Sequence, residues 1–432
     1  MKITPADRLQ GEVVLPGDKS ISHRAAIFSA LAEGQTRIHN FGTSADCAAT
    51  VKCLQALGVQ VDREGAGLSV KGVGKTGFQA PSNDLDCENS GTTMRLMAGV
   101  LAGQNFDSVL VGDGSLQKRP MKRIMDPLRL MGAEIEGIEN RAPLHISGRQ
   151  PLRAIEFVPP AASAQIKSCV LLAGLNCDGE TSVIEKTPTR DHSERMLRWF
   201  GADVIETDIS GGVKITVSGE ARLTAKDLYI PADISSAAFF IVAAAFLEGS
   251  ELVMPNVGIN PSRRAVVDVL KGLGIDIEIL DEKVVCHEPT GNLIVRGRGE
   301  IAAAKSPNLF TGSVIANMID EIPILAVAGT QLAGGLEIRN ASELRIKESD
   351  RIAAIVENLR RMNASVEEFN DGFRVERSDL KGAVIDSFGD HRIAMAFAVA
   401  GLLAEGETEI RGAESAAVSF PAFFETLAGV IY

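Results

Sequence analysis

One pattern recurs along the chain: a short polar turn, then an apolar helix of small residues that ends near Gly. Similar segments at a fixed period indicate a protein built from copies of one supersecondary unit. Successive turns lie 70 to 87 residues apart over 432 residues. The pattern therefore predicts six copies, with an insertion only in the fourth interval. The turns begin at Asp18, Asn89, Ser163, Asp233, Asp320 and Asp390, and the helices are expected at residues 23–32, 94–102, 168–175, 237–247, 325–328 and 394–404.

Each unit also offers a second, amphipathic helix, and in five units this helix stops at the same signal. The signal is an apolar residue followed by Gly, or once by Asn, and these two residues tolerate the left-handed backbone of a helix cap. Strands of period two follow it, as at residues 59–62 and 275–278, so the fold class is α/β. A helix over residues 420–427 completes the sixth unit. The signals are Leu57-Gly58, Met131-Gly132, Phe200-Gly201, Leu273-Gly274 and Met362-Asn363.

The length of the chain predicts two domains, because a single hydrophobic core stops growing at about 250–300 residues. Three units per domain is the simplest partition, with hinges near Gly17 and Pro231-Ala232. The first domain is then discontinuous, with residues 1–17 and 233–432, and the second comprises residues 18–232. An N-terminal strand expected at residues 12–15 belongs with the C-terminal half.

Composition excludes several classes of function. The formal net charge of −12 disfavours a nucleic-acid partner, because phosphate backbones require clustered positive charge. The apolar stretches at residues 237–247 and 393–403 are too short to span a membrane. No signal or transit segment precedes the first strand, so we expect a cytoplasmic protein. The six cysteines form no Cys-x-x-Cys pair and are expected to be reduced core residues.

Cations gather at the predicted helix starts. A helix N-terminus carries free N–H groups and partial positive charge, and it therefore binds anions. A single surface Lys or Arg is more often a solvated charge, but here the position recurs in copy after copy of an acidic protein. We therefore predict small, multiply anionic ligands. Lys19, Arg24, Arg95, Lys167 and Arg392 lie at first helices, and Arg119, Arg190, Lys347 and Arg351 open second helices.

Acidic residues lie among these cations. Asp320 could be a helix N-cap and Glu348 a first-turn partner of the helix dipole, each at even odds on spacing alone. His391, between Asp390 and Arg392, could equally be a satisfied core histidine. If these groups face one cleft, two carboxylates between cations can serve as general acid and general base. We expect no metal, because the acids sit among Lys and Arg.

Seven motifs together resemble the 5-enolpyruvylshikimate-3-phosphate synthase family over about residues 5–430. The resemblance implies a two-domain inverse α/β barrel with three βαβαββ units per domain and an active site in the cleft between the domains. It also implies transfer of the enolpyruvyl group of phosphoenolpyruvate to shikimate 3-phosphate, with no metal or organic cofactor. The motifs are residues 15–24, 89–92, 118–120, 163–165, 189–192, 344–351 and 390–392.

The same resemblance implies roles for individual residues. Glu348 is expected to protonate C3 of phosphoenolpyruvate, Asp320 to take the sugar hydroxyl proton, and Lys19 to stabilise both and assist departure of phosphate. Shikimate 3-phosphate is expected to contact Lys19, Ser20, Arg24, Ser163, Ala164, Gln165, Arg190, Asp320 and Lys347. Phosphoenolpyruvate is expected to contact Lys19, Asn89, Gly91, Arg119, Gln165, Glu348, Arg351, His391 and Arg392.

Three departures from the family pattern concern the binding residues. Val418 stands where many relatives carry Lys, Ala164 replaces a common Ser, and Glu343 replaces a common Asn. Gly91 is retained, so glyphosate is a candidate inhibitor.

Two alternatives stay open, and both concern the ligand. One is the related enolpyruvyl transferase acting on UDP-N-acetylglucosamine, which typically shows Lys-Asn where this chain has Lys19-Ser20. The other is a non-catalytic protein that binds phosphorylated metabolites. We expect the protein to be a monomer.

Overall fold

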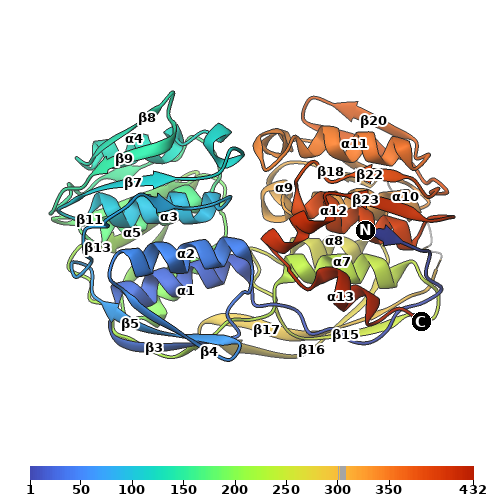
Figure 1. The fold of residues 1–432 in the computed structure, drawn as a ribbon, viewed down its shortest axis with the longest axis horizontal. Coiled ribbons are helices and arrows are strands. Elements are labelled where there is room, and N and C mark those ends of the chain that lie inside the picture. The colour runs from blue at the N-terminus through green and yellow to red at the C-terminus, as the bar shows by residue number, and fades with distance from the viewer. Residues whose placement is uncertain (300, 302–307) are drawn as a thin grey trace. The chain divides into compact units, whose positions relative to one another are not determined.

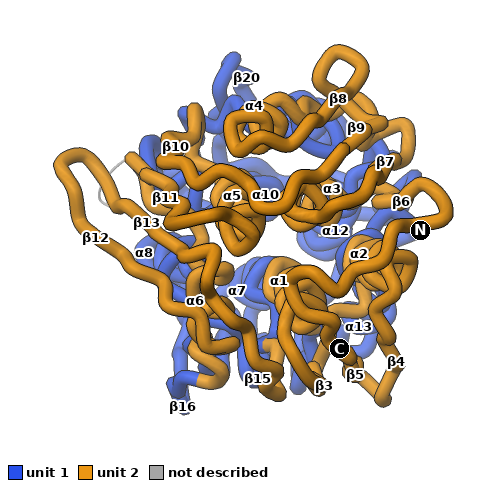
Figure 2. Tube along the Cα trace, turned by 90° about the vertical axis from the view of Figure 1, so that its left-hand side faces the viewer, with its two compact units in different colours: residues 1–16, 231–284, 289–432 blue, residues 17–230, 285–288 orange. Residues whose placement is uncertain are grey.

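The computed structural model describes residues 1–299, 301 and 308–432 of a mixed α/β chain (Figure 1). The chain divides into two compact units, coloured separately in Figure 2. Unit 1 comprises residues 1–16, 231–284 and 289–432, and unit 2 comprises residues 17–230 and 285–288. The sequence pattern did not single out the segment 285–288. Each unit has its own hydrophobic core.

Unit 2 contains three copies of one arrangement. A first helix leads to a strand, a second helix and an antiparallel hairpin, and a short strand pairs in parallel with the first strand. The first copy takes its short strand, β14, from the end of the unit. The copies are α1 (Lys19–Leu31), β3 (Glu33–His39), α2 (Ala45–Ala56), β4 (Gln60–Glu64), β5 (Gly67–Val73) and β14 (Leu228–Tyr229); β6 (Leu85–Asp86), α3 (Gly91–Ala102), β7 (Asp107–Val111), η1 (Leu116–Lys118), α4 (Lys122–Leu130), β8 (Glu134–Ile138) and β9 (Arg141–Ser147); and β10 (Glu156–Phe157), α5 (Ala164–Gly174), β11 (Glu180–Glu185), α6 (His192–Trp199), β12 (Val204–Ile209) and β13 (Gly212–Ser218).

The described part of unit 1 repeats this arrangement, but its last sheet has three strands, β1, β23 and β22. The N-terminal strand β1 pairs antiparallel with β23 in place of a hairpin. The copies are β2 (Gln10–Glu12), α7 (Ile234–Ala245), β15 (Glu251–Gly258), α8 (Ala265–Gly272), β16 (Asp276–Val285) and β17 (Glu288–Arg296); β18 (Leu309–Phe310), α9 (Ser313–Met318), α10 (Ile322–Gln331), β19 (Leu336–Ile338), η2 (Ser342–Ile346), α11 (Arg351–Arg361), β20 (Val366–Phe369) and β21 (Gly372–Val375); and β22 (Val384–Asp386), α12 (His391–Leu402), β23 (Thr408–Arg411), η3 (Ala413–Val418), α13 (Phe423–Ala428) and β1 (Lys2–Ile3).

The N-terminal strand expected at residues 12–15 begins two residues earlier, as β2 at Gln10–Glu12. It pairs in parallel with β15, which belongs to unit 1. The reason for the difference is that apolar alternation reports burial, whereas strand bounds depend on backbone pairing.

The first helices begin three or four residues earlier than the apolar pattern predicted. For example, α1 starts at Lys19, α3 at Gly91 and α12 at His391. The polar turns supply N-caps: the Asp18 carboxylate accepts a hydrogen bond from the Ile21 N–H, and the Ser90 hydroxyl accepts one from the Thr93 N–H. The polar residues of these turns therefore lie in the first turn of a helix or just before it, where the helix has N–H groups without a partner in the helix.

The ends of the second helices confirm the predicted left-handed caps. Gly58, Gly132, Gly201 and Gly274 have φ between +85° and +97°, and Asn363 has φ +66°. Each of these residues turns the chain from the helix into the following strand.

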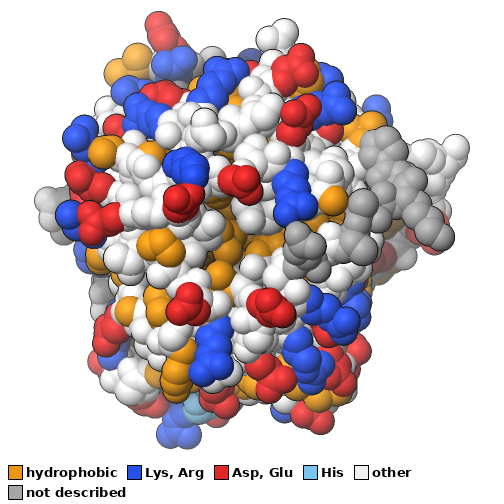
Figure 3. Space-filling view, turned by 90° about the vertical axis from the view of Figure 1, so that its right-hand side faces the viewer, with side chains coloured by type: hydrophobic (Ala, Val, Ile, Leu, Met, Phe, Trp, Pro, Cys, Tyr) orange, Lys and Arg blue, Asp and Glu red, His pale blue; other side chains and the backbone are white. Residues whose placement is uncertain are grey.

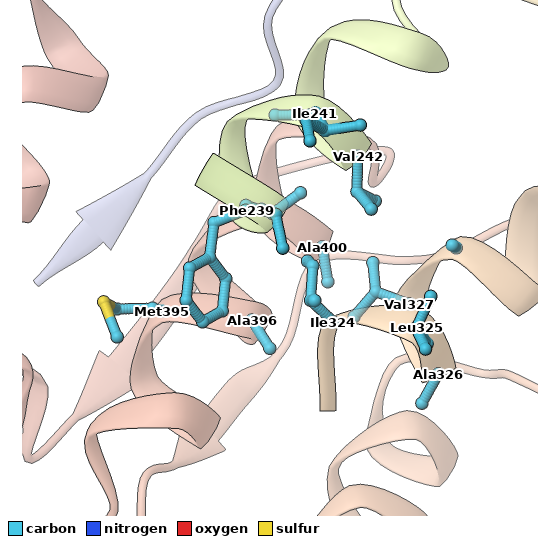
Figure 4. Close-up of a cluster of buried hydrophobic side chains, with 14 of the residues drawn as sticks. Phe239, Ile241, Val242, Ile324, Leu325, Ala326, Val327, Met395, Ala396 and Ala400 are labelled. Carbon is cyan, nitrogen blue, oxygen red and sulfur yellow. The ribbon is translucent and has the colours of Figure 1, made fainter. Parts of the chain in front are cut away.

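The first helices form the core of each unit. In Figure 4, side chains of α7, α10 and α12 meet in unit 1, among them Phe239, Ile324 and Met395. All 12 residues of α7 are buried. In unit 2, α1, α3 and α5 lie toward the middle with the sheets around them (Figure 2). Burial of each large apolar side chain contributes roughly 1.5–3 kcal/mol, so these helices are fixed along their length.

The surface of unit 1 carries many charged side chains, in contrast to the apolar core. Figure 3 shows acidic and basic side chains intermingled over the face in view, with apolar side chains in a hollow between them. Exposed ion pairs such as Lys2–Glu407 and Arg296–Glu251 belong to this surface and add little stability. Among the described residues, no helix has both the length and the hydropathy needed to span a membrane.

The Gly201→Ala substitution should lower the free energy of unfolding by about 1 kcal/mol, because a side chain at φ +95° is strained although open space surrounds the added methyl. Gly114→Ala is the control in the same unit: its methyl also meets open space, and its φ is not in the left-handed region. Urea unfolding monitored by Trp199, the only tryptophan of the chain, measures both. Equal stabilities of the two variants would contradict the prediction.

Candidate functional site

Two guanidinium groups lie over the start of α3 in unit 2. A Cβ built on Gly91 would lie 2.8 Å from Arg95 Nη1 and 3.3 Å from Arg119 Nη1. Arg119 Nη2 also donates a hydrogen bond of 2.7 Å to Asn89 Oδ1. Two Arg side chains beside a helix N-terminus form a site suited to a carboxylate or a phosphate. The absence of a side chain at position 91 lets the Arg95 and Arg119 guanidinium groups lie this close to the helix start.

Gln165 joins the start of α5 to the start of α3. Its Oε1 accepts a hydrogen bond of 2.7 Å from Arg95 Nη1, and its Nε2 donates one of 2.8 Å to Thr92 Oγ1. The two preceding positions are Ser163, the N-cap of α5, and Ala164, its first residue. Three of the predicted residues, Ser163, Ala164 and Gln165, therefore stand together at the start of α5, and Gln165 connects this start to Arg95 and Thr92 of α3.

Lys19 and Arg24 organise the start of α1. Lys19 Nζ lies 2.8 Å from Asp46 Oδ2, a partner in α2. Arg24 donates to Ser193 Oγ at 2.8 Å, to Ser168 Oγ at 2.7 Å and to the Ser20 carbonyl at 2.9 Å. Arg24 thereby ties the first turns of α1, α5 and α6 together.

His23 is buried one residue before Arg24. Burial, and then the charges of Lys19 and Arg24, lower the pKa of His23 well below its ordinary value. The ring is therefore neutral and contributes no charge to the cation cluster at neutral pH. Its Nδ1 lies 2.7 Å from Thr50 Oγ1, which lies 2.7 Å from Thr93 Oγ1, so the ring belongs to a buried hydrogen-bonded chain between α1, α2 and α3.

Lys167 does not have the role predicted for a helix-start cation. Its side chain is 1% exposed, and its Nζ lies 2.8 Å from Glu185 Oε2 and 2.6 Å from Glu194 Oε1. Burial disfavours its charge, but the two carboxylates outweigh burial and raise the pKa of Lys167. Glu185 also accepts hydrogen bonds from the backbone N–H and the hydroxyl of Thr189, the residue before Arg190. Lys167 thus supports the loop that carries Arg190 and has no surface to offer a ligand.

In unit 1, Arg351 contacts three carboxylates. Its Nε lies 2.7 Å from Asp390 Oδ2, its Nη2 2.6 Å from Glu348 Oε2, and its Nη1 3.5 Å from Asp320 Oδ1. Burial opposes the charge of Arg351, but the carboxylates of Asp390 and Glu348 outweigh it and raise the pKa. Exposure separates the three acids: Asp390 is 0% exposed, whereas Glu348 is 17% and Asp320 18% exposed. Asp390 therefore anchors Arg351, and the other two carboxylates reach the surface.

Three further cationic or basic residues adjoin these acids. Arg392 Nη1 donates to the Asp320 carbonyl at 2.9 Å, and its Nη2 lies 3.9 Å from Asp320 Oδ2. Burial lowers the pKa of Lys347, although the nearby charge of Asp320 opposes that effect. Glu343 also acts to raise the Lys347 pKa, so this departure adds negative charge to the site. His391 is buried as the first residue of α12.

Asp320 is not a helix N-cap, and Glu348 is not a first-turn partner of a helix dipole, so these two alternative roles are wrong. The N-cap position of α10 is occupied by Glu321, so Asp320 precedes it, and α11 is capped by Asp350, which places Glu348 outside the helix. Val418 ends η3, as a half-buried residue. Among residues 1–299, 301 and 308–432, no group of three or more His, Cys, Asp and Glu side chains is arranged to hold a metal ion.

Sequence reasoning missed four residues that support the clusters. Asp46 pairs with Lys19, and Arg263, Ser235 and Glu321 form a buried group next to Arg392. A signal for Arg263 existed, because it precedes α8 as Arg119 precedes α4, in the same place of the repeat. The repeat also marked Ser235, which follows Asp233 as Ser20 follows Asp18, whereas no periodic pattern marks Asp46.

The fold defines the class of protein. The enolpyruvyl transferase NikO from Streptomyces tendae superposes with a TM-score of 0.78 at 18% identity, over 99% of this chain and 96% of NikO. An EPSP synthase from Acinetobacter baumannii superposes with a TM-score of 0.86 at 41% identity, over 100% and 98% of the two chains. The chain thus has the fold of enolpyruvyl transferases, the two-domain inverse α/β barrel, as predicted.

Sequence similarity then gives the family. The family model for EPSP synthase (3-phosphoshikimate 1-carboxyvinyltransferase) matches residues 3–427. Proteins named 3-phosphoshikimate 1-carboxyvinyltransferase are 50% identical in Solibacter usitatus, over 99% of this chain and 98% of the relative, and 46% identical in Brevibacillus brevis, over 99% of both. The chain belongs to the EPSP synthase family, which confirms the resemblance inferred from its motifs.

Lys167→Met should lower the free energy of unfolding by about 3–5 kcal/mol at pH 7, because it leaves two buried carboxylates without their cation. Such carboxylates have a folded-state pKa above the unfolded value, so the loss diminishes as the pH falls below that raised pKa. Urea unfolding at several pH values measures both effects. The control is Lys214→Met, which breaks a pair with Glu156 whose side chains are 34% and 55% exposed. Equal losses in the two variants would refute the assignment.

Proposed function

We propose that this chain transfers the enolpyruvyl group of phosphoenolpyruvate to the 5-hydroxyl of shikimate 3-phosphate and releases phosphate. Family membership over the whole chain supports this reaction. The structural observation that carries it is the position of the Arg351 guanidinium between two acids. Its Nη2 lies 2.6 Å from Glu348 Oε2 and its Nη1 lies 3.5 Å from Asp320 Oδ1, and both carboxylates reach the surface. Two carboxylates on one cation can act as an acid and a base in the same reaction.

The residues that we assign to each substrate come from both units. We therefore propose that the cations at the helix starts of unit 2 and the residues around Arg351 in unit 1 act in one reaction. For shikimate 3-phosphate the support is Arg24, which is held by three hydrogen bonds before ligand arrives, and preorganised donors bind anions with little loss of entropy. Its residues are Lys19, Ser20, Arg24, Ser163, Ala164, Gln165 and Arg190 of unit 2, and Asp320 and Lys347 of unit 1.

For phosphoenolpyruvate the support is the Gly91 cluster, in which the guanidinium groups of Arg95 and Arg119 lie against the start of α3 at Gly91. The carboxylate and the phosphate of this substrate need separate cations, and the assigned set supplies them from both units. The residues are Lys19, Asn89, Gly91, Arg119 and Gln165 of unit 2, and Glu348, Arg351, His391 and Arg392 of unit 1.

The proposed mechanism proceeds by addition and then elimination. Glu348 donates a proton to C3 of phosphoenolpyruvate, which makes C2 electrophilic, and the 5-hydroxyl oxygen bonds to C2 as Asp320 takes its proton. In the tetrahedral intermediate, C3 then returns a proton to the Glu348 carboxylate as the bond from C2 to the phosphate oxygen breaks, and the departing phosphate takes the hydroxyl proton from Asp320. The products are the enolpyruvyl ether and phosphate. Lys19 stabilises the departing phosphate, and fixed Arg charges stabilise the intermediate without reorganisation.

Further aspects of the proposal concern the protein as a whole. We propose that it acts as a monomer in the cytoplasm without a cofactor. Glyphosate, an anionic phosphonate, is expected to compete with phosphoenolpyruvate at the Gly91 cluster.

The pure protein should release phosphate when phosphoenolpyruvate and shikimate 3-phosphate are both present, and Glu348→Gln should lower kcat by ~100-fold or more, the scale of acid–base catalysis. Exposed Glu367→Gln is the control and should keep the wild-type rate. A colorimetric phosphate assay measures both. Release of phosphate only with UDP-N-acetylglucosamine would replace the proposed acceptor, and release with neither acceptor would favour a binding protein.

Gly91→Ala should raise the KM for phosphoenolpyruvate by about tenfold, equivalent to ~1.4 kcal/mol, because the methyl would press on Arg95 and Arg119. The KM for shikimate 3-phosphate should change by less than about twofold: Gln165, which is assigned to both substrates, contacts Arg95, but Arg24, Arg190 and Lys347 are not among the residues that the methyl would meet first. Gly114→Ala, whose methyl meets open space, is the matched control in steady-state kinetics. If both KM values rose together, the cluster would not be specific for phosphoenolpyruvate.

A further inference from the structure

A second carboxylate, Glu321, lies next to Asp320 in the chain, and the proposed mechanism does not use it. Its side chain is buried, with 1% exposure. Its Oε1 accepts a short hydrogen bond from Ser235 Oγ and lies 3.7 Å from Arg392 Nη1, and its Oε2 has no hydrogen-bond partner among the described residues. A buried carboxylate with so few hydrogen bonds is costly unless nearby cations balance its charge.

One balancing cation lies beyond Ser235. Arg263, which is buried, donates a hydrogen bond of 2.7 Å from Nη2 to Ser235 Oγ, and the same nitrogen lies 3.4 Å from Asp233 Oδ1. The Ser235 hydroxyl therefore accepts from Arg263 and donates to Glu321, which fixes the direction of its dipole. Through the Ser235 hydroxyl, Arg263, which precedes α8, acts on the carboxylate of Glu321 at the start of α10.

The other balancing cation is Arg392, and two acids share it. Arg392 Nη1 lies 3.7 Å from Glu321 Oε1, and Arg392 Nη2 lies 3.9 Å from Asp320 Oδ2. Arg392 makes a shorter contact with the Asp320 backbone, because its Nη1 donates a hydrogen bond of 2.9 Å to the Asp320 carbonyl. By contrast, Arg351 pairs with Asp390 at 2.7 Å. The Arg392 guanidinium is thus held between two carboxylates and is closely paired with neither.

We infer that Glu321 is a positioning residue for the enolpyruvyl transfer: it keeps the Arg392 guanidinium from closing onto the Asp320 carboxylate, so that Asp320 remains basic enough to take the hydroxyl proton. This inference rests on the proposed function. Glu321 itself is buried and acts through Arg392, without touching substrate.

Neutralising Glu321 has a definite sign. In Glu321→Gln, Arg392 loses one of its two anions and moves toward Asp320, and Asp320 also loses a like charge. Both changes favour ionised Asp320, so its pKa falls and it becomes a weaker base. The variant leaves in place the nearby charged groups Arg351, Lys347, Glu348 and Asp390.

Removing the cation beyond Ser235 has the opposite sign. In Arg263→Gln the charge of Glu321 is less balanced, so Glu321 attracts Arg392 more strongly and away from Asp320. The pKa of Asp320 then rises. The two variants therefore predict shifts in opposite directions, which a general loss of stability would not produce.

The experiment is kcat as a function of pH with both substrates saturating, because the acid limb of that profile reports the base in the substrate complex. Glu321→Gln should move the acid limb to lower pH and lower the plateau by about tenfold, and Arg263→Gln should move the limb to higher pH. Glu321→Asp keeps the charge and should restore the wild-type limb. Glu337→Gln, which removes the partner of Arg339 in unit 1, is the control and should leave the profile unchanged.

Circular dichroism and thermal melting show whether each variant is folded. A folded Glu321→Gln with the wild-type acid limb would overturn the inference, as would shifts of both variants in the same direction. If Glu321→Gln does not fold, the direction of the Arg263→Gln shift decides. Failure of the proposed function is a separate result, because then the wild-type protein itself releases no phosphate.

Discussion

Burial of the first helices is the constraint on which the rest of the structure depends. All residues of α7 and α12 are buried, as are most residues of α1. A helix enclosed in this way can present only its end to a ligand, and its N-terminus is the end that attracts anions. The polar residues of each motif are therefore confined to a first turn or to the segment just before one. Repetition of the unit repeats this arrangement, which explains why cations recur at equivalent places in the chain.

Charge in these clusters is organised by burial as much as by distance. Arg351 is buried with Asp390, and this pair fixes a guanidinium to which two more exposed acids attach. Lys167 shows the opposite outcome at a similar place in the repeat, because its two acids are as buried as it is. Glu185 and Glu194, the acids paired with Lys167, are 6% and 2% exposed, whereas Glu348 and Asp320 beside Arg351 are 17% and 18% exposed. A ligand can therefore reach these two acids of Arg351 more readily than those of Lys167.

Much of the fold could be predicted from the sequence, because it depends on local signals. Gly58 and Asn363 mark helix ends through backbone conformation alone, and their positive φ values agree with that reasoning. The helix starts were displaced because apolar periodicity reports buried side chains, while capping residues such as Ser90 extend the helix by a turn. N-cap patterns could have corrected this error.

The site was predictable only where residue type limits the possible roles. The resemblance to the family implies roles for Glu348 and Asp320, but the pairing in space decides which cation contacts each acid, and no spacing rule gives that pairing. The role of Lys167 depended on two acids 18 and 27 positions away along the chain. Glu321 was passed over for the same reason, since its partners Ser235 and Arg392 come from two other segments and Arg263, which contacts Ser235, comes from a third.

Pairing between short strands that lie far apart in the sequence has a consequence for folding during synthesis. Residues 17–230 form nearly all of unit 2, and β14 closes its first sheet, so this unit can complete its strand pairing while the remainder is still being translated. Residues 2–3 must wait much longer for their partners, because Lys2 pairs with Glu409. Domains generally fold as units during synthesis. Strand β1 is therefore translated before unit 2 but is among the last elements to pair, and a chain stalled before residue 408 would carry it unpaired.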